Sequence, residues 1–151
     1  MTLLKRVLQP FLLPAFPSSA LLFLRLIVGL AFIFHGWGKI QSPFAWMPPD
    51  SPVPGILQFL AAFSEFGGGI ALILGLLTPV AMLGLGFTMA VATCMHALVL
   101  KDPFVNPKGG GSYELALVYL AIAILFIALG PGKFSLDAML FGNRQPKEPA
   151  Q

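Results

Sequence analysis

The sequence predicts an all-α membrane protein, a bundle of four transmembrane helices. Of its 151 residues, 57% are hydrophobic and only 10% are charged, which is outside the range of soluble globular domains. Four apolar segments approach the roughly 20 residues that a helix needs to cross a hydrocarbon core of about 30 Å. These segments follow one another closely, with no polar stretch long enough to fold alone. We therefore expect one membrane domain over residues 20–132, flanked by residues 1–19 and 133–151.

Residues 1–19 have a basic start and an apolar content that three prolines interrupt. They lack the intact apolar core and cleavage site of a signal peptide, so we interpret them as a retained segment at the membrane interface. The first spanning helix is predicted over residues 20–39. On this helix Arg25, His35 and Lys39 fall on one stripe, at the 3.5-residue spacing of a packed seam. Because charges in lipid are unfavourable, the stripe is expected to face other helices.

The second and third helices are predicted over residues 56–77 and 80–100. The link between them is so short that they must be antiparallel neighbours, with Thr78 as a cap and Pro79 at the first helical position. The Pro-rich residues 41–55 carry aromatic side chains suited to the interface and can cover the mouth of the bundle. The glycines that permit close packing of these two helices are Gly67, Gly68, Gly69, Gly75, Gly84 and Gly86.

The fourth helix is predicted over residues 113–129, with Ser112 as its N-cap and a Gly-Pro-Gly sequence after it. Residues 133–151 are expected to form a short surface helix and a disordered tail. Basic residues at the membrane edges are more numerous on the side of the two termini, which predicts that the N- and C-termini are cytoplasmic. That side has Lys5, Arg6, Lys133, Arg144 and Lys147, and the other side has Lys39, Lys101 and Lys108.

Composition excludes several kinds of chemistry. The net charge of +3 is weak and scattered, so nucleic acid is not an expected partner. A single cysteine, Cys94, excludes an internal disulfide and a CxxC redox pair. The sequence holds no haem-attachment motif and no nucleotide-binding fingerprint, so no covalently bound cofactor and no metal site are predicted. Any redox cofactor must be diffusible or supplied by a partner.

Five polar side chains are predicted within the bilayer. A rise of about 1.5 Å per residue from the inner boundary places Arg25 roughly 6 to 8 Å deep, Glu65 about 18 Å and His35 about 21 Å. His96 and Glu114 lie about 25 Å deep on the same count. Glu65 is decisive, because an ionised carboxylate near mid-membrane costs several kcal/mol unless it is paired. His35 is nearest in level, and a His35–Glu65 hydrogen bond would make the pair a proton donor or acceptor.

Each polar residue also has a purely structural interpretation. Arg25 lies about 10 to 12 Å below Glu65, more than an arginine comfortably spans, and its side chain can instead snorkel to the headgroups. Lys39 fits an interfacial anchor, and Glu114 fits a favourable anion in the first turn of the fourth helix. Glu65 itself can be a protonated acid bonded to a backbone carbonyl.

The pattern LRLxxGxxFxxHGxxK over Leu24–Lys39, with ExGGGxxLxxG over Glu65–Gly75 and then Thr78-Pro79, resembles the DoxX family of small four-helix membrane proteins. The resemblance extends over roughly residues 21–137. This family is named for a subunit of a membrane thiosulfate:quinone oxidoreductase. The resemblance implies a multi-pass protein of the bacterial plasma (inner) membrane that supports redox chemistry with the quinone pool, beside a peripheral oxidoreductase subunit. The recurrent polar positions of the family correspond to Arg25, His35, Glu65, His96 and Glu114.

We therefore predict a membrane subunit that binds a quinone-like or other lipophilic small molecule from the lipid bilayer, with Glu65 and His35 exchanging protons. Quinone reduction consumes protons, which suits buried titratable groups. The residues expected to bind the ligand are Arg25, His96 and Glu114, with Phe32, Trp37 and Phe66 as aromatic lining. Proton exchange alone does not establish catalysis, so whether the protein is an enzyme, as a subunit of a quinone-linked oxidoreductase, stays open.

Three other functions stay open at this point. The protein can be a non-catalytic assembly or scaffold protein whose buried charges fix helix packing. A third interpretation makes His35 and His96 the axial ligands of a haem. Transport is a fourth, although four short helices leave little room for alternating access unless the protein oligomerises. The oligomeric state is not specified by the sequence.

Overall fold

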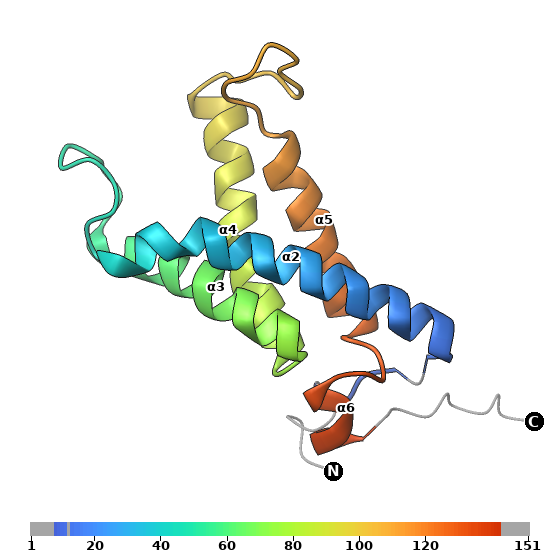
Figure 1. Cartoon of the computed structure of the whole chain (residues 1–151). Coiled ribbons are helices and arrows are strands. Elements are labelled where there is room, and N and C mark those ends of the chain that lie inside the picture. The colour runs from blue at the N-terminus through green and yellow to red at the C-terminus, as the bar shows by residue number, and fades with distance from the viewer. Residues whose placement is uncertain (1–7, 12, 143–151) are drawn as a thin grey trace, which may run out of the picture.

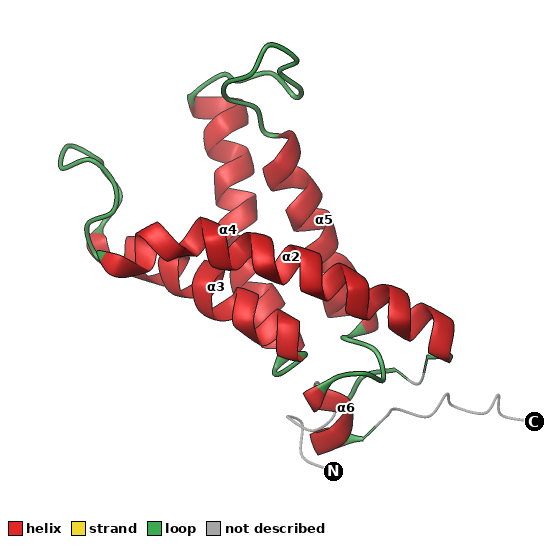
Figure 2. Cartoon of the chain, viewed as in Figure 1, coloured by secondary structure: helices red, strands yellow, loops and turns green. Residues whose placement is uncertain are grey.

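The computed structural model describes residues 8–11 and 13–142, and the regular secondary structure of this part is helical (Figure 2). Its helices are α2 (Ala15–Gln41), α3 (Gly55–Leu74), α4 (Thr78–Cys94), the π-helix η1 (Met95–Val99), α5 (Glu114–Leu129) and α6 (Leu136–Phe141). The predicted all-α class is confirmed. Residues 1–7 of the predicted interfacial segment and the predicted tail from residue 143 lie outside the described residues.

Two helical hairpins form the domain. α2 packs along α3, α4 packs along α5, and α3 contacts α4 across the short link between them. The hairpins diverge, so the connections 42–54 and 100–113 lie apart from each other (Figure 1). α6 lies at the opposite end of the molecule from both connections (Figure 1). We call the end that carries the two connections the loop end, and the other end the α6 end.

The helices have the length and composition of membrane spans. α2, α3 and the continuous helix Thr78–Val99 meet both criteria, and α5 is a shorter apolar helix of 16 residues. At about 24 Å, α5 is somewhat shorter than a hydrocarbon core of roughly 30 Å. Large apolar side chains such as Phe34 and Phe87 are exposed on the outside of the bundle, where they suit contact with lipid. The predicted membrane bundle is confirmed, and the side on which the termini lie stays a prediction.

Several helix boundaries differ from those expected. α2 begins earlier, at Ala15, because Pro17 lies in the first turn, where a backbone N–H has no intrahelical partner. α3 ends earlier, at Leu74, because Gly75 takes a left-handed conformation with φ of 62° and closes the helix. Pro79 lies in the first turn of α4 as its second residue and not, as predicted, its first, because α4 begins at Thr78.

The predicted helix caps are wrong at both positions. Thr78 is buried, and its Oγ1 has no hydrogen-bond partner among the described residues. The Asp137 carboxylate, from the start of α6, instead accepts hydrogen bonds from the backbone N–H groups of Leu77 (2.7 Å) and Thr78 (2.9 Å). The carboxylate of a residue distant in sequence therefore accepts hydrogen bonds from the backbone N–H groups that are free at the N-terminus of α4. For α5, the N-cap position is Tyr113 rather than Ser112, without a side-chain cap.

Glycines bring the backbones of α2 and α3 together. A Cβ atom at Gly29 would lie 2.7 Å from the carbonyl oxygen of Gly69, and one at Gly36 would lie 2.5 Å from the backbone nitrogen of Phe66. Both distances are too short for a real Cβ contact, so the two helices approach as closely as they do only because these residues are glycines.

Gly36→Ala is expected to destabilise the protein, whereas Gly38→Ala, its matched control two positions along the same helix, is not. The added methyl at Gly36 forces α2 and α3 apart, which costs about 1 to 3 kcal/mol. At Gly38 no atom lies within 4 Å, and removing a helical glycine there stabilises by roughly 0.5 to 1 kcal/mol. Thermal unfolding in detergent checks this, and equal midpoints for the two variants would contradict the close packing.

Candidate functional site

Glu65, the buried carboxylate expected to be decisive, lies on α3 and is paired with Lys39 of α2. Its side chain is 3% exposed, and its Oε1 accepts a hydrogen bond from the Lys39 ammonium, with Nζ 2.6 Å away. Lys39 lies in the last turn of α2, and its side chain is 26% exposed. Lys39 therefore does more than the interfacial anchor that was expected, because its ammonium is the cation that compensates Glu65.

The rotation of α2 explains why Lys39, and not His35, is the partner. Phe32 and Gly36 are buried on the face of α2 that continues to Lys39, whereas His35 is exposed. Oε1 of Glu65 bonds to Lys39 and Oε2 bonds to no described group, so the predicted His35–Glu65 hydrogen bond is absent from the described residues.

His35 lies instead beside α5. Its ring is edge-on to the ring of Tyr119, with the two centroids 6.3 Å apart. Phe32, one turn earlier, contacts the same tyrosine ring, at 4.8 Å between centroids, and is itself a core residue rather than the lining of a pocket. His35 and Tyr119 thus mark a polar position on the seam where the two hairpins meet.

The second carboxylate oxygen of Glu65, Oε2, is buried and has no hydrogen-bond partner among residues 8–11 and 13–142. Buried polar atoms without a partner are uncommon in folded proteins, because each loses its hydration without a replacement. Trp46 lies over the pair at the loop end, with its ring centroid 4.6 Å from Lys39 Nζ. At this oxygen the pair can therefore accept a further hydrogen bond, for example from a ligand hydroxyl.

Arg25 belongs to a second polar cluster, at the α6 end. It is 1% exposed, which excludes the snorkelling interpretation. Asp137, which caps α4, acts on the guanidinium electrostatically. The guanidinium donates hydrogen bonds of 2.7 to 3.0 Å to the backbone carbonyls of Leu72, Ile73, Pro131 and Phe134. These carbonyls belong to the end of α3 and to the turn after α5, so we interpret Arg25 as a structural residue in place of the ligand-binding role that we had predicted.

The other residues expected to bind the ligand are spread over the bundle. Trp37 is exposed and packs against Phe66, with ring centroids 5.8 Å apart, on the outside of the α2–α3 hairpin. His96 lies in η1, with its Nδ1 2.7 Å from Oδ2 of Asp102. Glu114 is exposed in the first turn of α5, where an anion is favourable. These side chains do not converge on one pocket with Glu65.

Two residues of these clusters were not singled out from the sequence, Tyr119 and Asp137, whereas Gln58 is predicted to share a small, polar stripe of the second helix with Glu65 and is buried there. Tyr119 places a polar group in an apolar spanning helix, and that feature is a signal for a buried or ligand-binding role. Asp137 follows the last spanning helix closely, and its importance depends on tertiary contacts with residues 77 and 78.

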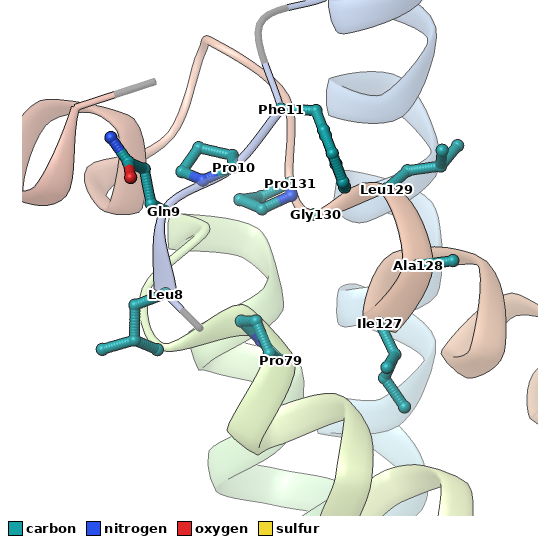
Figure 3. A pocket seen from close by; sticks show the side chains of 10 residues that line it. All are labelled: Leu8, Gln9, Pro10, Phe11, Pro79, Ile127, Ala128, Leu129, Gly130 and Pro131. Atoms are coloured by element: carbon teal, nitrogen blue, oxygen red, sulfur yellow. The ribbon is translucent and has the colours of Figure 1, made fainter. Parts of the chain in front are cut away.

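A hollow of about 170 Å³ opens at the α6 end (Figure 3). Its lining is mostly apolar and comes from the residues before α2, Pro79 and the end of α5. None of the predicted ligand-binding residues lines it. It is also smaller than the roughly 300 to 1,000 Å³ typical of ligand pockets, so we assign it no ligand.

Among the described residues, no three histidine, cysteine or acidic side chains are grouped closely enough to hold a metal ion. Besides the Arg25 and Asp137 cluster, the titratable groups that contact one another in this part of the chain form the Lys39–Glu65 pair, the His35–Tyr119 contact and the His96–Asp102 pair.

Residues 20–98, which include Lys39 and Glu65, match the family model of DoxX. An uncharacterized protein of Haemophilus influenzae is 34% identical over 122 residues, covering 80% of this chain and 90% of the relative. Inner membrane protein YqjF of Escherichia coli K12 is 32% identical over 122 residues, covering 77% and 88%. A Bacillus subtilis protein named "Putative oxidoreductase CatD" is 25% identical over 126 residues, covering 82% and 89%. No solved structure matches the chain.

The family match spans the first three membrane helices and both halves of the Lys39–Glu65 pair. Together with helices long enough to cross a bilayer and a relative named as an inner membrane protein, it identifies a multi-pass protein of the inner membrane. The chain belongs to the DoxX family.

Proposed function

We propose that the protein is a membrane subunit that supports redox chemistry by binding a quinone-like lipophilic molecule and exchanging protons with it at Glu65. The observation that carries the proposal is the buried Glu65 carboxylate, which bonds to Lys39 through Oε1 and leaves Oε2 without a partner. A bare carboxylate oxygen beside an ammonium can take a proton from a quinol hydroxyl or return one to a quinone oxygen. The oxidoreductase name of the CatD relative supports redox chemistry in this family.

Lys39 and Glu65 have complementary roles in this proposal. The ammonium offsets part of the free energy that the Glu65 carboxylate loses when it is removed from water. Lys39 also lies near the end of α2 with a quarter of its side chain exposed, so it connects the buried oxygen to the water-facing loop end. The electrons come from a peripheral oxidoreductase subunit, the partner that the family resemblance implies.

His35 lies one helical turn before Lys39 on α2 and faces outward beside Tyr119. In our proposal these two side chains contact the ring of the ligand when it enters from the bilayer, and Glu65 then exchanges a proton with it. The aromatic rings of Phe32 and Tyr119 give this approach an apolar wall.

Glu65→Gln is expected to lower quinone-linked activity by about 100-fold, the range in which general acid–base groups contribute. The amide keeps the shape of the side chain and its hydrogen bonds but cannot exchange a proton. The assay is decylubiquinone reduction, with thiosulfate as the electron donor that the family resemblance implies, by membranes that contain the protein, above that of membranes without it, at matched protein level. Asp50→Asn, at an exposed acid with no predicted role in ligand binding, is the control and should leave the activity unchanged. Unchanged activity in Glu65→Gln, with normal protein level, would sink the proton-exchange role.

Mass spectrometry of lipophilic molecules that co-purify with the protein tests the ligand class directly. We expect a quinone, quinol or related ring compound in the extract of the wild-type protein. The scaffold function is the second candidate, because Arg25 demonstrates that this fold uses a buried charge to hold helix ends. Under that alternative, no ring compound co-purifies and Glu65→Gln keeps its activity.

A further inference from the structure

The connection 42–54 between α2 and α3, which we call the strap, folds back over the Lys39–Glu65 pair. Its Trp46 donates a hydrogen bond from Nε1 to the backbone carbonyl of Gln58, at 2.9 Å. The Trp46 ring lies over the ammonium of Lys39, with its centroid 4.6 Å from Nζ. The strap thus places an aromatic face on the cation that neutralises Glu65.

Gln58 holds both sides of the strap. It lies in the first turn of α3 and is 6% exposed. Its Oε1 accepts a hydrogen bond from the backbone N–H of Met47 (3.0 Å), and its Nε2 donates to the carbonyl of Val53 (2.9 Å). With the bond from Trp46, three hydrogen bonds join the strap to this single residue.

The strap has few other means of attachment in its middle. Five of its residues are prolines, which have no backbone N–H to donate. Phe44 anchors its beginning by stacking on Phe59 of α3, with ring centroids 5.0 Å apart. Gly55 permits this approach at the other end, because a Cβ there would lie 2.9 Å from the Phe44 carbonyl oxygen. The middle of the strap is therefore held by Gln58 between two anchored ends.

Gln58 also lies on the face of α3 that carries the carboxylate. Gln58, Ala62 and Glu65 are buried at helical spacing, so the residue that holds the strap and the residue beneath it share one rigid element. A change in the strap then alters what covers Lys39 without moving Glu65 itself.

We propose that the strap is a cover over the Lys39–Glu65 pair, with Gln58 as its positioning residue and Trp46 as the side chain that closes it. Release of the strap from Gln58 opens the pair to water at the loop end, and this controls access to the buried carboxylate. This inference rests on the proposed function for its meaning, because it concerns access to the proposed proton-exchange site. Its test uses accessibility alone and needs no redox activity.

The test uses the full-length protein in lipid nanodiscs. The chain has two tryptophans, so Trp37→Phe leaves Trp46 as the sole fluorophore. In that background, Gln58→Leu removes the two side-chain hydrogen bonds, to Met47 and Val53, and leaves the bond from Trp46 to the backbone carbonyl. It should raise acrylamide quenching of Trp46 by at least about fivefold, the change in population expected from losing even one net hydrogen bond. Gln41→Leu is the matched control, since the Gln41 amide donates only to the exposed carbonyl of Trp37 among the contacts described for it.

Acylation of lysines by a water-soluble amine reagent, resolved by mass spectrometry, gives the second readout. Lys39 should react faster in Gln58→Leu than in the wild type, relative to the exposed Lys101 and Lys108 of the other connection. If Gln58→Leu does not fold, Trp46→Phe replaces the indole with a smaller aromatic ring, removes the Nε1 hydrogen bond and should also raise the acylation rate at Lys39.

Unchanged rates at Lys39 in the folded variants, with unchanged Trp46 quenching, overturn the strap as a cover. Faster acylation and quenching in Gln58→Leu, with no change in Gln41→Leu, support it. A different experiment would contradict the proposed function, namely full quinone-linked activity in Glu65→Gln. The two proposals are therefore tested by different measurements.

Discussion

Arg25→Lys is expected to lower the thermal unfolding midpoint of the detergent-solubilised protein by on the order of 10 °C. The guanidinium bonds four carbonyls that belong to two separate segments, the end of α3 and the turn that leads into α6. A lysine ammonium has fewer donors, and it cannot present the planar arrangement that reaches these carbonyls together. Buried carbonyls then lose their partners, at about 1 to 3 kcal/mol each.

The effect of Arg25→Lys extends to the start of α4. Asp137 caps α4 by accepting hydrogen bonds from Leu77 and Thr78, and its carboxylate is fully buried. The charge of Arg25 acts on this carboxylate, so a displaced cation leaves Asp137 less well compensated. One substitution on α2 therefore weakens the α6 end of α3, α4 and α5 at once.

Lys133→Met is the matched control for Arg25→Lys. Lys133 also lies at the α6 end, but its ammonium rests on the ring of Phe134, 4.9 Å from the centroid, at a half-buried position. Its loss should change the midpoint little. An Arg25→Lys protein that unfolds like the wild type but has lost its ligand would instead restore the ligand-binding role predicted for Arg25.

Local patterns were sufficient to predict the fold class. Apolar segments of spanning length, separated by prolines, glycines and polar turns, identify the four long helices of the bundle. The left-handed Gly75 after α3 is a local signal for a helix end, but the prediction treated it as a packing residue and placed the end of the helix at residue 77. The cap of α4 is not predictable from local sequence, because its carboxylate, Asp137, comes from 59 and 60 residues away in sequence. A sequence rule that looks only at Thr78 cannot detect it.

The candidate site shows how a small error in helical phase changes a prediction. Three turns of 3.5 residues, counted from Arg25, end midway between His35 and Gly36, and the predicted stripe took His35. Three turns of the 3.6-residue period of a straight α-helix end closer to Gly36. The buried residues of α2 follow the second count, through Gly29, Phe32 and Gly36, and leave His35 exposed. The carboxylate at Glu65 was predicted correctly as buried, whereas its partner required knowledge of how α2 is rotated against α3.

Lys39→Met is expected to destabilise the protein by about 2 to 3 kcal/mol, less than the 3 to 5 kcal/mol typical of breaking a fully buried pair. The carboxylate of Glu65 is 3% exposed, so without its cation it must stay ionised and uncompensated or take up a proton. Lys39 is 26% exposed, and solvent screening of its charge makes the loss smaller. Lys101→Met, at an exposed lysine of the other connection, is the control and should leave the unfolding midpoint unchanged.

The double variant Lys39→Met with Glu65→Gln is expected to recover most of that stability, because it removes the uncompensated charge together with its partner. The two hypotheses, proton exchange with a quinone and a purely structural role in helix packing, then predict different quinone-linked activities for this well-folded double variant. If the pair exchanges protons with a quinone, the double variant keeps its unfolding midpoint but loses decylubiquinone reduction, since a neutral amide offers no titratable oxygen. If the pair only fixes helix packing, stability and activity recover together. Measuring both quantities on one preparation therefore separates a functional ion pair from a structural one.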